Sequence, residues 1–196
     1  MNLPLQPAEL EQLAREGCFV RPDWLPAPLP EQARAAVEGL EGFRPAQIGR
    51  GPDRQQHPEI RGDELLWLDP ADPPVALLPV VRAFEQLKEQ LNREAYLGLQ
   101  RLELQAARYS RPGAHYERHL DSFRGRPGRR LTCLYYLNPA WAPSQGGLLR
   151  LHLASGPVDI PPQLNQLVVF LSDEVEHQVL PSFAVRWALT AWWSGG

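Results

Sequence analysis

The spacing of apolar residues changes at about Leu99, from a helical period to a period of two. Beyond that point, short runs either alternate between apolar and polar residues or are wholly apolar, and each run ends in a turn signal. Successive side chains of a β-strand point to opposite faces, so these runs predict strands. They occupy residues 102–109, 114–120, 131–137, 147–153, 167–171 and 184–193. Short strands at such intervals are typical of an antiparallel barrel or jelly roll.

Apolar side chains recur every three or four residues in three earlier segments, namely Ala8–Glu16, Pro30–Leu40 and a stretch from Leu78 to Glu94. This spacing predicts amphipathic helices, and we expect the first third of the chain to consist of helices and loops. Between the second and third helix, Ile48–Asp63 is rich in glycine, arginine and proline. Structureless segments of about 16 residues are usually functional or mobile, so this one is expected to act as a lid.

A chain of 196 residues is long enough for one full hydrophobic core. The expected fold is α+β and mainly β. It consists of a double-stranded β-helix, or jelly roll, over about residues 99–196, with supporting N-terminal helices over about residues 1–98. We therefore expect a single domain that spans residues 1–196.

The composition limits which binding partners and which cellular compartment can be expected for the protein. The net charge of −3 gives no electrostatic reason to expect a nucleic-acid or membrane partner. Cys18 and Cys133 are far apart and in no paired spacing, which argues against a disulfide framework or a thiolate zinc cluster. The first residues lack a secretory pattern, and no apolar stretch approaches the roughly 20 residues that span a bilayer. A cytoplasmic protein is expected.

A possible metal site begins with His119 and Asp121, which lie two apart in a predicted strand and therefore share a face. A second histidine, His177, follows the apolar strand at 167–171 and a polar corner. Two histidines and one carboxylate are the ligands of non-haem Fe(II) oxygenases, and they leave coordination positions open. A structural zinc site would need a fourth protein ligand, for which no cysteine is suitably placed. A histidine and an aspartate at this spacing occur often by chance, so the pair alone is weak evidence for a metal site.

Arg186 comes nine residues after the last of these histidines, inside the apolar run 184–193. With a period of two it shares one face with Thr190 and Trp192. Burying an arginine costs free energy unless the guanidinium is paired, and a guanidinium binds a carboxylate through two parallel hydrogen bonds. An internal salt bridge or a surface position is the alternative. Beside the metal ligands, Arg186 and Thr190 indicate a dicarboxylate that chelates iron at one end, which describes 2-oxoglutarate.

Three ordered stretches around these residues resemble the 2-oxoglutarate-dependent prolyl hydroxylases of the oxygen-sensing type. They read RYSRPGAHYERHLD, RLTCLYYLNPAWAPSQGGLLRL and LVVFLSDEVEHQVLPSFAVRWALTAWW. A further stretch, IRGDELLWLDP at Ile60–Pro70, is similar to the segment that follows the mobile substrate loop of these enzymes. The likeness is strongest to the bacterial branch, which acts on elongation factor Tu.

The resemblance implies Fe(II), 2-oxoglutarate and O2 as cofactor and co-substrates, and it leaves ascorbate open as an accessory reductant. The iron ligands that it implies are His119, Asp121 and His177. The implied co-substrate residues are Tyr136, Arg186, Thr190 and Trp192, the last packed towards the substrate.

For the substrate, the resemblance implies hydroxylation of a prolyl residue in a protein, with elongation factor Tu as the candidate. Tyr109 would line the iron pocket, Arg130 would lie near the bound substrate, and Arg61 and Asp63 would shape the loop over the entrance. The turn SFRGRPGRR and the loop Ile48–Glu59 depart from the animal enzymes, so substrate contacts are not transferred there. The same chemistry on a small molecule or another residue type, or a non-oxidative metal-binding jelly roll, remains the alternative.

The other histidines and one glycine pair have ordinary structural interpretations. His57, His115 and His152 are expected not to bind a metal, and the residues before His115 disfavour a helix that could pair it with another ligand. Gly146-Gly147 is followed by no helix, so it is interpreted as a bulge or the start of a strand and not as a phosphate-binding loop.

Overall fold

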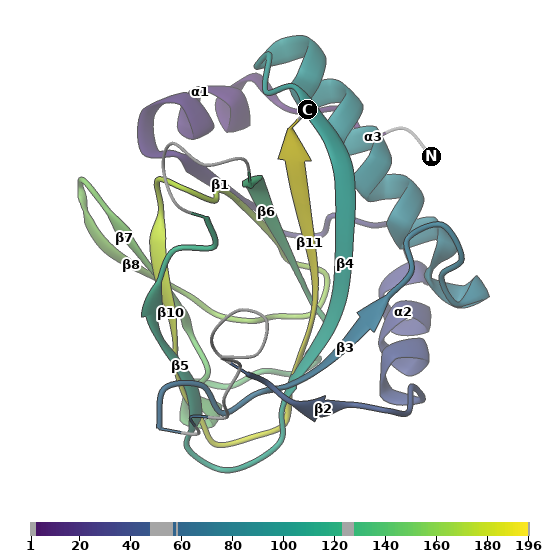
Figure 1. Ribbon diagram of the computed structural model, residues 1–196, viewed down its shortest axis with the longest axis vertical. Coiled ribbons are helices and arrows are strands. Elements are labelled where there is room, and N and C mark those ends of the chain that lie inside the picture. The colour runs from purple at the N-terminus through teal and green to yellow at the C-terminus, as the bar shows by residue number, and fades with distance from the viewer. Residues whose placement is uncertain (1–2, 48–56, 58, 123–127, 196) are drawn as a thin grey trace.

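The computed structural model describes residues 3–47, 57, 59–122 and 128–195. They form two antiparallel sheets, one of seven strands and one of four, with helices against the outside of the larger sheet (Figure 1). This is the predicted jelly roll with supporting helices. None of the helices in these residues combines the length and the hydropathy needed to cross a bilayer.

The three predicted helices are confirmed as α1 (Pro7–Glu16), α2 (Leu29–Glu38) and α3 (Leu78–Glu94). The described residues also contain the short 3-10 helices η2 (Val75–Leu77) and η3 (Pro143–Gln145). Helix α1 ends where Gly17 adopts φ +73°, the left-handed conformation that commonly terminates a helix. Helix α3 buries one stripe of its surface, including Phe84, Leu87 and Leu91, against the larger sheet.

The larger sheet has the strand order β1-β9-β6-β11-β4-β3-β2, and the smaller has the order β5-β10-β7-β8. The strands of the larger sheet are β1 (Cys18–Arg21), β2 (Arg44–Pro45), β3 (Glu64–Leu68), β4 (Leu99–Tyr109), β6 (Arg129–Tyr136), β9 (Leu167–Leu171) and β11 (Arg186–Gly195). Those of the smaller sheet are β5 (Ala114–His119), β7 (Leu149–Leu153), β8 (Gly156–Ile160) and β10 (Glu176–Ser182).

The expectation that the first third of the chain contains only helices and loops is wrong, because β1, β2 and β3 join the larger sheet. Strand β1 pairs with β9 from Cys18 opposite Phe170, and β3 pairs with β4 from Glu64 opposite Arg108. These strands are at most five residues long, which is too short to display a clear period in the sequence. Their partners lie far along the chain, so pairing and not local pattern determines them.

The hydrophobic core is divided by the larger sheet, and β11 shows how. Its side chains alternate as predicted: Trp187, Leu189 and Trp193 pack in the cluster that includes the helices, whereas Ala188 packs in the cluster between the two sheets. The face of β11 that carries Arg186 is therefore turned to the interior of the jelly roll, where the two sheets face each other.

Candidate metal centre and active-site cavity

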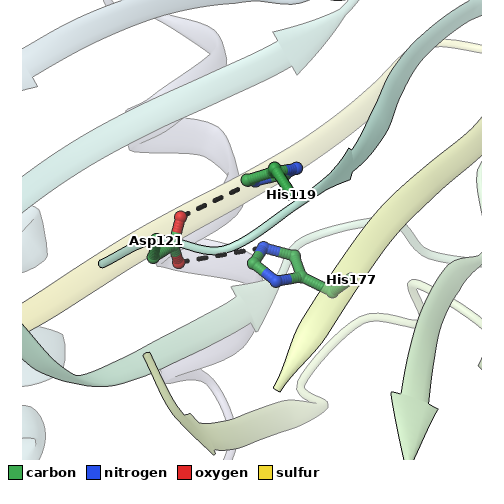
Figure 2. A group of neighbouring side chains, drawn as sticks. All are labelled: His119, Asp121 and His177. Atoms are coloured by element: carbon green, nitrogen blue, oxygen red, sulfur yellow. Dashed lines mark ion pairs between the residues drawn. The ribbon is translucent and has the colours of Figure 1, made fainter. Parts of the chain in front are cut away.

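Three side chains that could bind a metal ion converge between the sheets (Figure 2). His119 is the last residue of β5, Asp121 follows two residues later, and His177 lies in β10 directly opposite His119. Nε2 of His119 is 3.7 Å from Oδ1 of Asp121, and Nε2 of His177 is 3.8 Å from Oδ2. Their ligand atoms all lie within 4.8 Å of one another. The three residues singled out in the sequence are thus brought together in space.

Hydrogen bonds orient both imidazole rings towards this point. Nδ1 of His119 lies 2.7 Å from the carbonyl oxygen of Glu117, and Nδ1 of His177 lies 3.3 Å from that of Val175. Because a carbonyl oxygen only accepts, each Nδ1 carries a proton, which leaves Nε2 as the nitrogen that can bind a metal. Burial lowers the pKa of His177 to about 4, so its ring is neutral near pH 7, the form that binds a metal.

Asp121 is the most constrained member of the group. Its Oδ2 accepts hydrogen bonds from Oγ1 of Thr132 at 2.7 Å and from the indole Nε1 of Trp192 at 2.9 Å. Burial by itself raises the pKa of this carboxyl, but His177, His119 and the Trp192 indole outweigh it and hold the pKa far below its usual range. Asp121 is therefore a fixed anion. Trp192, expected beside the substrate, also supports a metal ligand.

Arg186 is 5% exposed, and within the described part of the chain no carboxylate lies close enough to form a salt bridge with it. Its Nε donates to the carbonyl oxygen of Gly147 at 2.8 Å and its Nη2 to the hydroxyl of Tyr136 at 3.2 Å. The rings of Tyr109 and Tyr136 each lie 4.9 Å from the guanidinium carbon. The alternatives of an internal salt bridge and a surface arginine are both wrong. A buried cation without a counter-ion is a site for an anion.

Both tyrosines beside Arg186 are protonated. Burial raises the pKa of Tyr136 above its usual value, and it raises the pKa of Tyr109 well above it. A phenol that keeps its proton can donate a hydrogen bond to an anion. The guanidinium and the two hydroxyls are thus compatible with a carboxylate ligand.

One cavity of about 1560 Å³ connects the metal group with Arg186 and opens to the surface. Most of the residues singled out in the sequence contribute to its wall. Those are Arg61, Asp63, Tyr109, His119, Asp121, His177, Arg186, Thr190 and Trp192. The carboxylate of Asp63 is bound by Arg61 at 2.7 and 2.9 Å, and Arg61 also lies over the ring of Tyr116. The expected lid Ile48–Asp63 falls mainly on residues 48–56 and 58, which lie outside the described residues.

Arg130 does not reach the cavity, contrary to expectation. Its Nη1 donates to the carbonyl oxygen of Leu97 at 2.8 Å. The neighbouring Arg129 lines the cavity instead, with its guanidinium 3.8 Å from the ring of Trp192 and 2.8 Å from the carboxylate of Glu103. The cause is a bulge in β6: the partner of Trp193 is residue 131, whereas the partner of the next residue of β11 is residue 129. One extra residue in a strand exchanges the faces of those that precede it.

Several side chains at the site were not anticipated. Thr132 bonds Asp121, Tyr116 stacks on the ring of His119 with centroids 3.7 Å apart, and Trp67 contacts Trp192. Only Thr132 carried a signal, since a hydroxyl inside an apolar strand needs a hydrogen-bond partner. The remaining three histidines have other contacts. His57 and His115 each contact Glu59, and His152 contacts Gln178.

Comparisons with known proteins bear on this cavity. Residues 104–194 match the 2OG-Fe(II) oxygenase superfamily. Human Egl nine homolog 1 is 33% identical over 142 residues, which are 69% of this chain and 33% of that protein. Human prolyl hydroxylase EGLN3 is 34% identical over 143 residues, which are 68% of this chain and 59% of that protein. The chain thus spans less than two thirds of the length of these curated relatives.

Among the solved structures that are similar to this chain, two prolyl hydroxylases each cover most of it. A Pseudomonas putida prolyl-4-hydroxylase is 37% identical with a TM-score of 0.81, covering 96% of this chain and 98% of that one. A prolyl hydroxylase from Trichoplax adhaerens, solved in complex with a peptide fragment of hypoxia inducible factor, is 27% identical with a TM-score of 0.84. That match covers 95% of this chain and 87% of the other.

Proposed function

The chain belongs to the 2OG-Fe(II) oxygenase superfamily, and from that premise we propose that it hydroxylates a prolyl residue of a protein, using Fe(II), 2-oxoglutarate and O2. The observation that carries the proposal is the pairing, in one cavity, of a two-histidine, one-carboxylate group with a buried arginine that has no counter-ion among the described residues. The first element suits iron and the second suits the distal carboxylate of 2-oxoglutarate.

The donor set fits Fe(II). His119 and His177 each offer Nε2, and Asp121 offers a carboxylate oxygen, all within 4.8 Å of one another. The described residues contain no fourth His, Cys, Asp or Glu in this group, so the set stays open on one side. Open positions are what a chelating co-substrate and dioxygen require. We assign these three residues as the iron ligands.

The other end of the cavity fits a dicarboxylate. Arg186 would bind the distal carboxylate with a guanidinium that Gly147 and Tyr136 already orient, and Thr190, four residues further along β11 on the same face, would add its hydroxyl. Tyr109, which keeps its proton, can donate a further hydrogen bond. These residues bind and orient the co-substrate and do not react themselves.

Bound iron and 2-oxoglutarate supply the oxidation, in which dioxygen and 2-oxoglutarate are consumed, succinate and carbon dioxide are released, and a C–H bond becomes C–OH. The protein's part is positioning. Asp121 stays anionic because its two hydrogen bonds and the adjacent histidines stabilise the charge. The buried side chains Trp192, Ala188 and Leu149 contribute apolar surface to the inner wall of the cavity, beside the metal group and Arg186.

The prolyl target is supported by the relatives, and by an outer wall that suits an apolar ring. Trp67 is 55% exposed at the mouth, and its ring lies 5.7 Å from that of the buried Trp192. A pyrrolidine ring, which has no N–H, packs well on such aromatic faces. We propose elongation factor Tu as the substrate protein, on the likeness of the sequence to the bacterial branch of these hydroxylases and the similarity to the P. putida structure.

The test is to incubate the iron-loaded protein with 2-oxoglutarate and a prolyl peptide from elongation factor Tu, with a Pro→Ala peptide as the control. We expect succinate and a peptide heavier by one oxygen atom, and neither with the control peptide. His119→Ala should abolish turnover, whereas His115→Ala, in the same strand but outside the metal group, should retain it. Full activity of His119→Ala would remove the oxygenase proposal. Modification of other prolyl peptides but not this one would remove elongation factor Tu alone.

A further inference from the structure

Gln105, in the middle of β4, is a buried polar side chain without a partner. Its exposed fraction is 2%, it lines the active-site cavity, and no group in residues 3–47, 57, 59–122 and 128–195 hydrogen-bonds to its carboxamide. The other buried amides behave differently: Asn138, Asn165 and Gln166 each donate to a main-chain carbonyl. The carboxamide of Gln105 reaches the open space of the cavity, where a polar group that has no protein partner is available to a ligand.

Sheet register fixes where this carboxamide lies. Gln105 is directly opposite Thr190 on β11 and directly opposite Trp67 on β3. Residues opposite each other in antiparallel strands share a face, with Cβ atoms roughly 5 Å apart. Gln105 therefore stands between the co-substrate end of the cavity, where Thr190 and Arg186 lie, and the mouth, where Trp67 is 55% exposed. This is the part of the wall that a second substrate must pass.

The charges around Gln105 are matched in pairs. Arg61 binds Asp63 at 2.7 Å, and Arg129 binds Glu103 at 2.8 Å. Because each of these two guanidiniums already has its carboxylate, neither is free to attract an ionic group. Gln105 itself offers a neutral donor and a neutral acceptor in one plane. The complementary ligand is a group that also carries both, and a peptide group does.

We propose that Gln105 determines specificity by pairing its carboxamide with a main-chain peptide group of the protein substrate, beside the target proline. The inference rests on the proposed function. A prolyl nitrogen carries no hydrogen, so the N–H group that donates to the side-chain oxygen of Gln105 belongs to a residue next to the proline. The side-chain NH2 of Gln105 donates to a main-chain carbonyl of the substrate. Such a contact selects a polypeptide over a small molecule without reading the side chains next to the proline.

The first test compares Gln105→Met with Gln100→Met, which makes the same change at an exposed position of the same strand. The probe is a prolyl peptide that the wild-type protein hydroxylates, and its Kd is measured without oxygen, in the presence of iron and 2-oxoglutarate. We expect Gln105→Met to raise the Kd about three- to tenfold, which corresponds to one net hydrogen bond, and Gln100→Met to leave it unchanged. In Gln105→Met, the KM for 2-oxoglutarate should not rise and the thermal midpoint should not fall.

A second test identifies the partner group. Peptides in which one amide N–H near the proline is replaced by an ester oxygen are bound to the wild-type and Gln105→Met proteins. At one position the ester should weaken binding to wild type but not to Gln105→Met, because both changes remove the same hydrogen bond. Additive losses at every position, an unchanged peptide Kd, or a loss confined to 2-oxoglutarate would overturn the inference while leaving the hydroxylase proposal intact. Failure of wild type to hydroxylate any prolyl peptide would remove both.

Discussion

At the scale of single residues, the arginine that suits 2-oxoglutarate is positioned by a glycine. The carbonyl of Gly147 accepts from Nε of Arg186, and Gly147 has φ +68°. A Cβ there would lie 2.9 Å from Cδ of Arg186 and 2.9 Å from Oγ of Ser182, closer than ordinary contacts allow. The glycine pair interpreted from the sequence as a bulge or the start of a strand thus allows the backbone to approach the guanidinium.

Gly147→Ala is expected to raise the KM for 2-oxoglutarate by about tenfold or more, because it displaces a charged hydrogen-bonding group. Gly113→Ala is the matched control: its φ is +81°, but nothing lies within 4 Å of the added Cβ. That variant should show only backbone strain, about 1 kcal/mol in the free energy of unfolding. Measuring KM and thermal unfolding for both separates the two effects. Equal KM values would show that Gly147 does not position Arg186.

Two buried threonines are expected to have separable roles. Thr132 donates to Asp121, so Thr132→Val removes a hydrogen bond to a metal ligand and should weaken metal binding roughly 10- to 100-fold. Thr190 lines the cavity near Arg186, so Thr190→Val should raise the 2-oxoglutarate requirement and leave metal affinity nearly unchanged. Titration with Mn(II), followed by 2-oxoglutarate, distinguishes the two. The reverse pattern would contradict both assignments.

At the scale of elements, the bulge in β6 decides which of two adjacent arginines reaches the cavity. Arg129→Ala removes the guanidinium that lies over Trp192, and we expect peptide affinity to fall about two- to fivefold. Arg130→Ala removes a hydrogen bond to Leu97 outside the cavity, so it should lower the thermal midpoint and leave peptide affinity unchanged. Peptide titrations and melting curves of the two variants test this. A larger loss of affinity in Arg130→Ala would contradict the bulge.

The elements differ in how far sequence predicts them. Strand β11 was predicted with both faces, because a period of two is maintained over ten residues and each face is buried. Strand β10 was missed although it alternates: Glu176 and Gln178 are only partly buried, while His177 and Val179 point inward. Histidine counts as polar in a hydrophobicity pattern even when it points inward. A strand whose inward residue is a metal-binding histidine therefore lacks apolar alternation and looks like a loop in the sequence.

Features that depend on how strands pair with one another could not be predicted from the sequence. The bulge at Arg130 exists only relative to β11, so no local pattern records it. Gln105 has the same parity in its strand as Tyr109, which places both on the cavity face, but the lack of a hydrogen bond is visible only in three dimensions. The metal ligands could be predicted because His119 and Asp121 are two residues apart and His177 completes a two-histidine, one-carboxylate set.

At the scale of the whole molecule, the site depends on both sheets. His119 and His177 belong to the smaller sheet, whereas Arg186, Thr190 and Trp192 belong to the larger one. A metal and 2-oxoglutarate that bind across this gap stabilise the folded chain only while both sheets are in place. Ligand binding should therefore be visible in global unfolding.

With Mn(II) as a redox-stable substitute for iron, metal and 2-oxoglutarate at saturating concentration should together raise the thermal midpoint by roughly 5 °C or more. Arg186→Ala should lose the increment caused by 2-oxoglutarate and keep the one caused by the metal. Scanning calorimetry of the two proteins with each ligand alone and together is the measurement. Loss of the metal increment in Arg186→Ala would show that the arginine supports the fold of the metal group instead of binding the co-substrate.

Burial along β11 limits how such a protein can diverge. Every residue from Arg186 to Ser194 is buried, with alternate side chains committed to the core and to the cavity. Almost every substitution in this strand would therefore disturb either the core or the cavity. Trp67 and Glu103, on the outer wall, are exposed or half-exposed and can be exchanged without opening the core. Descendants with new substrates would therefore differ first along β3 and β4, while β11 would be inherited nearly unchanged.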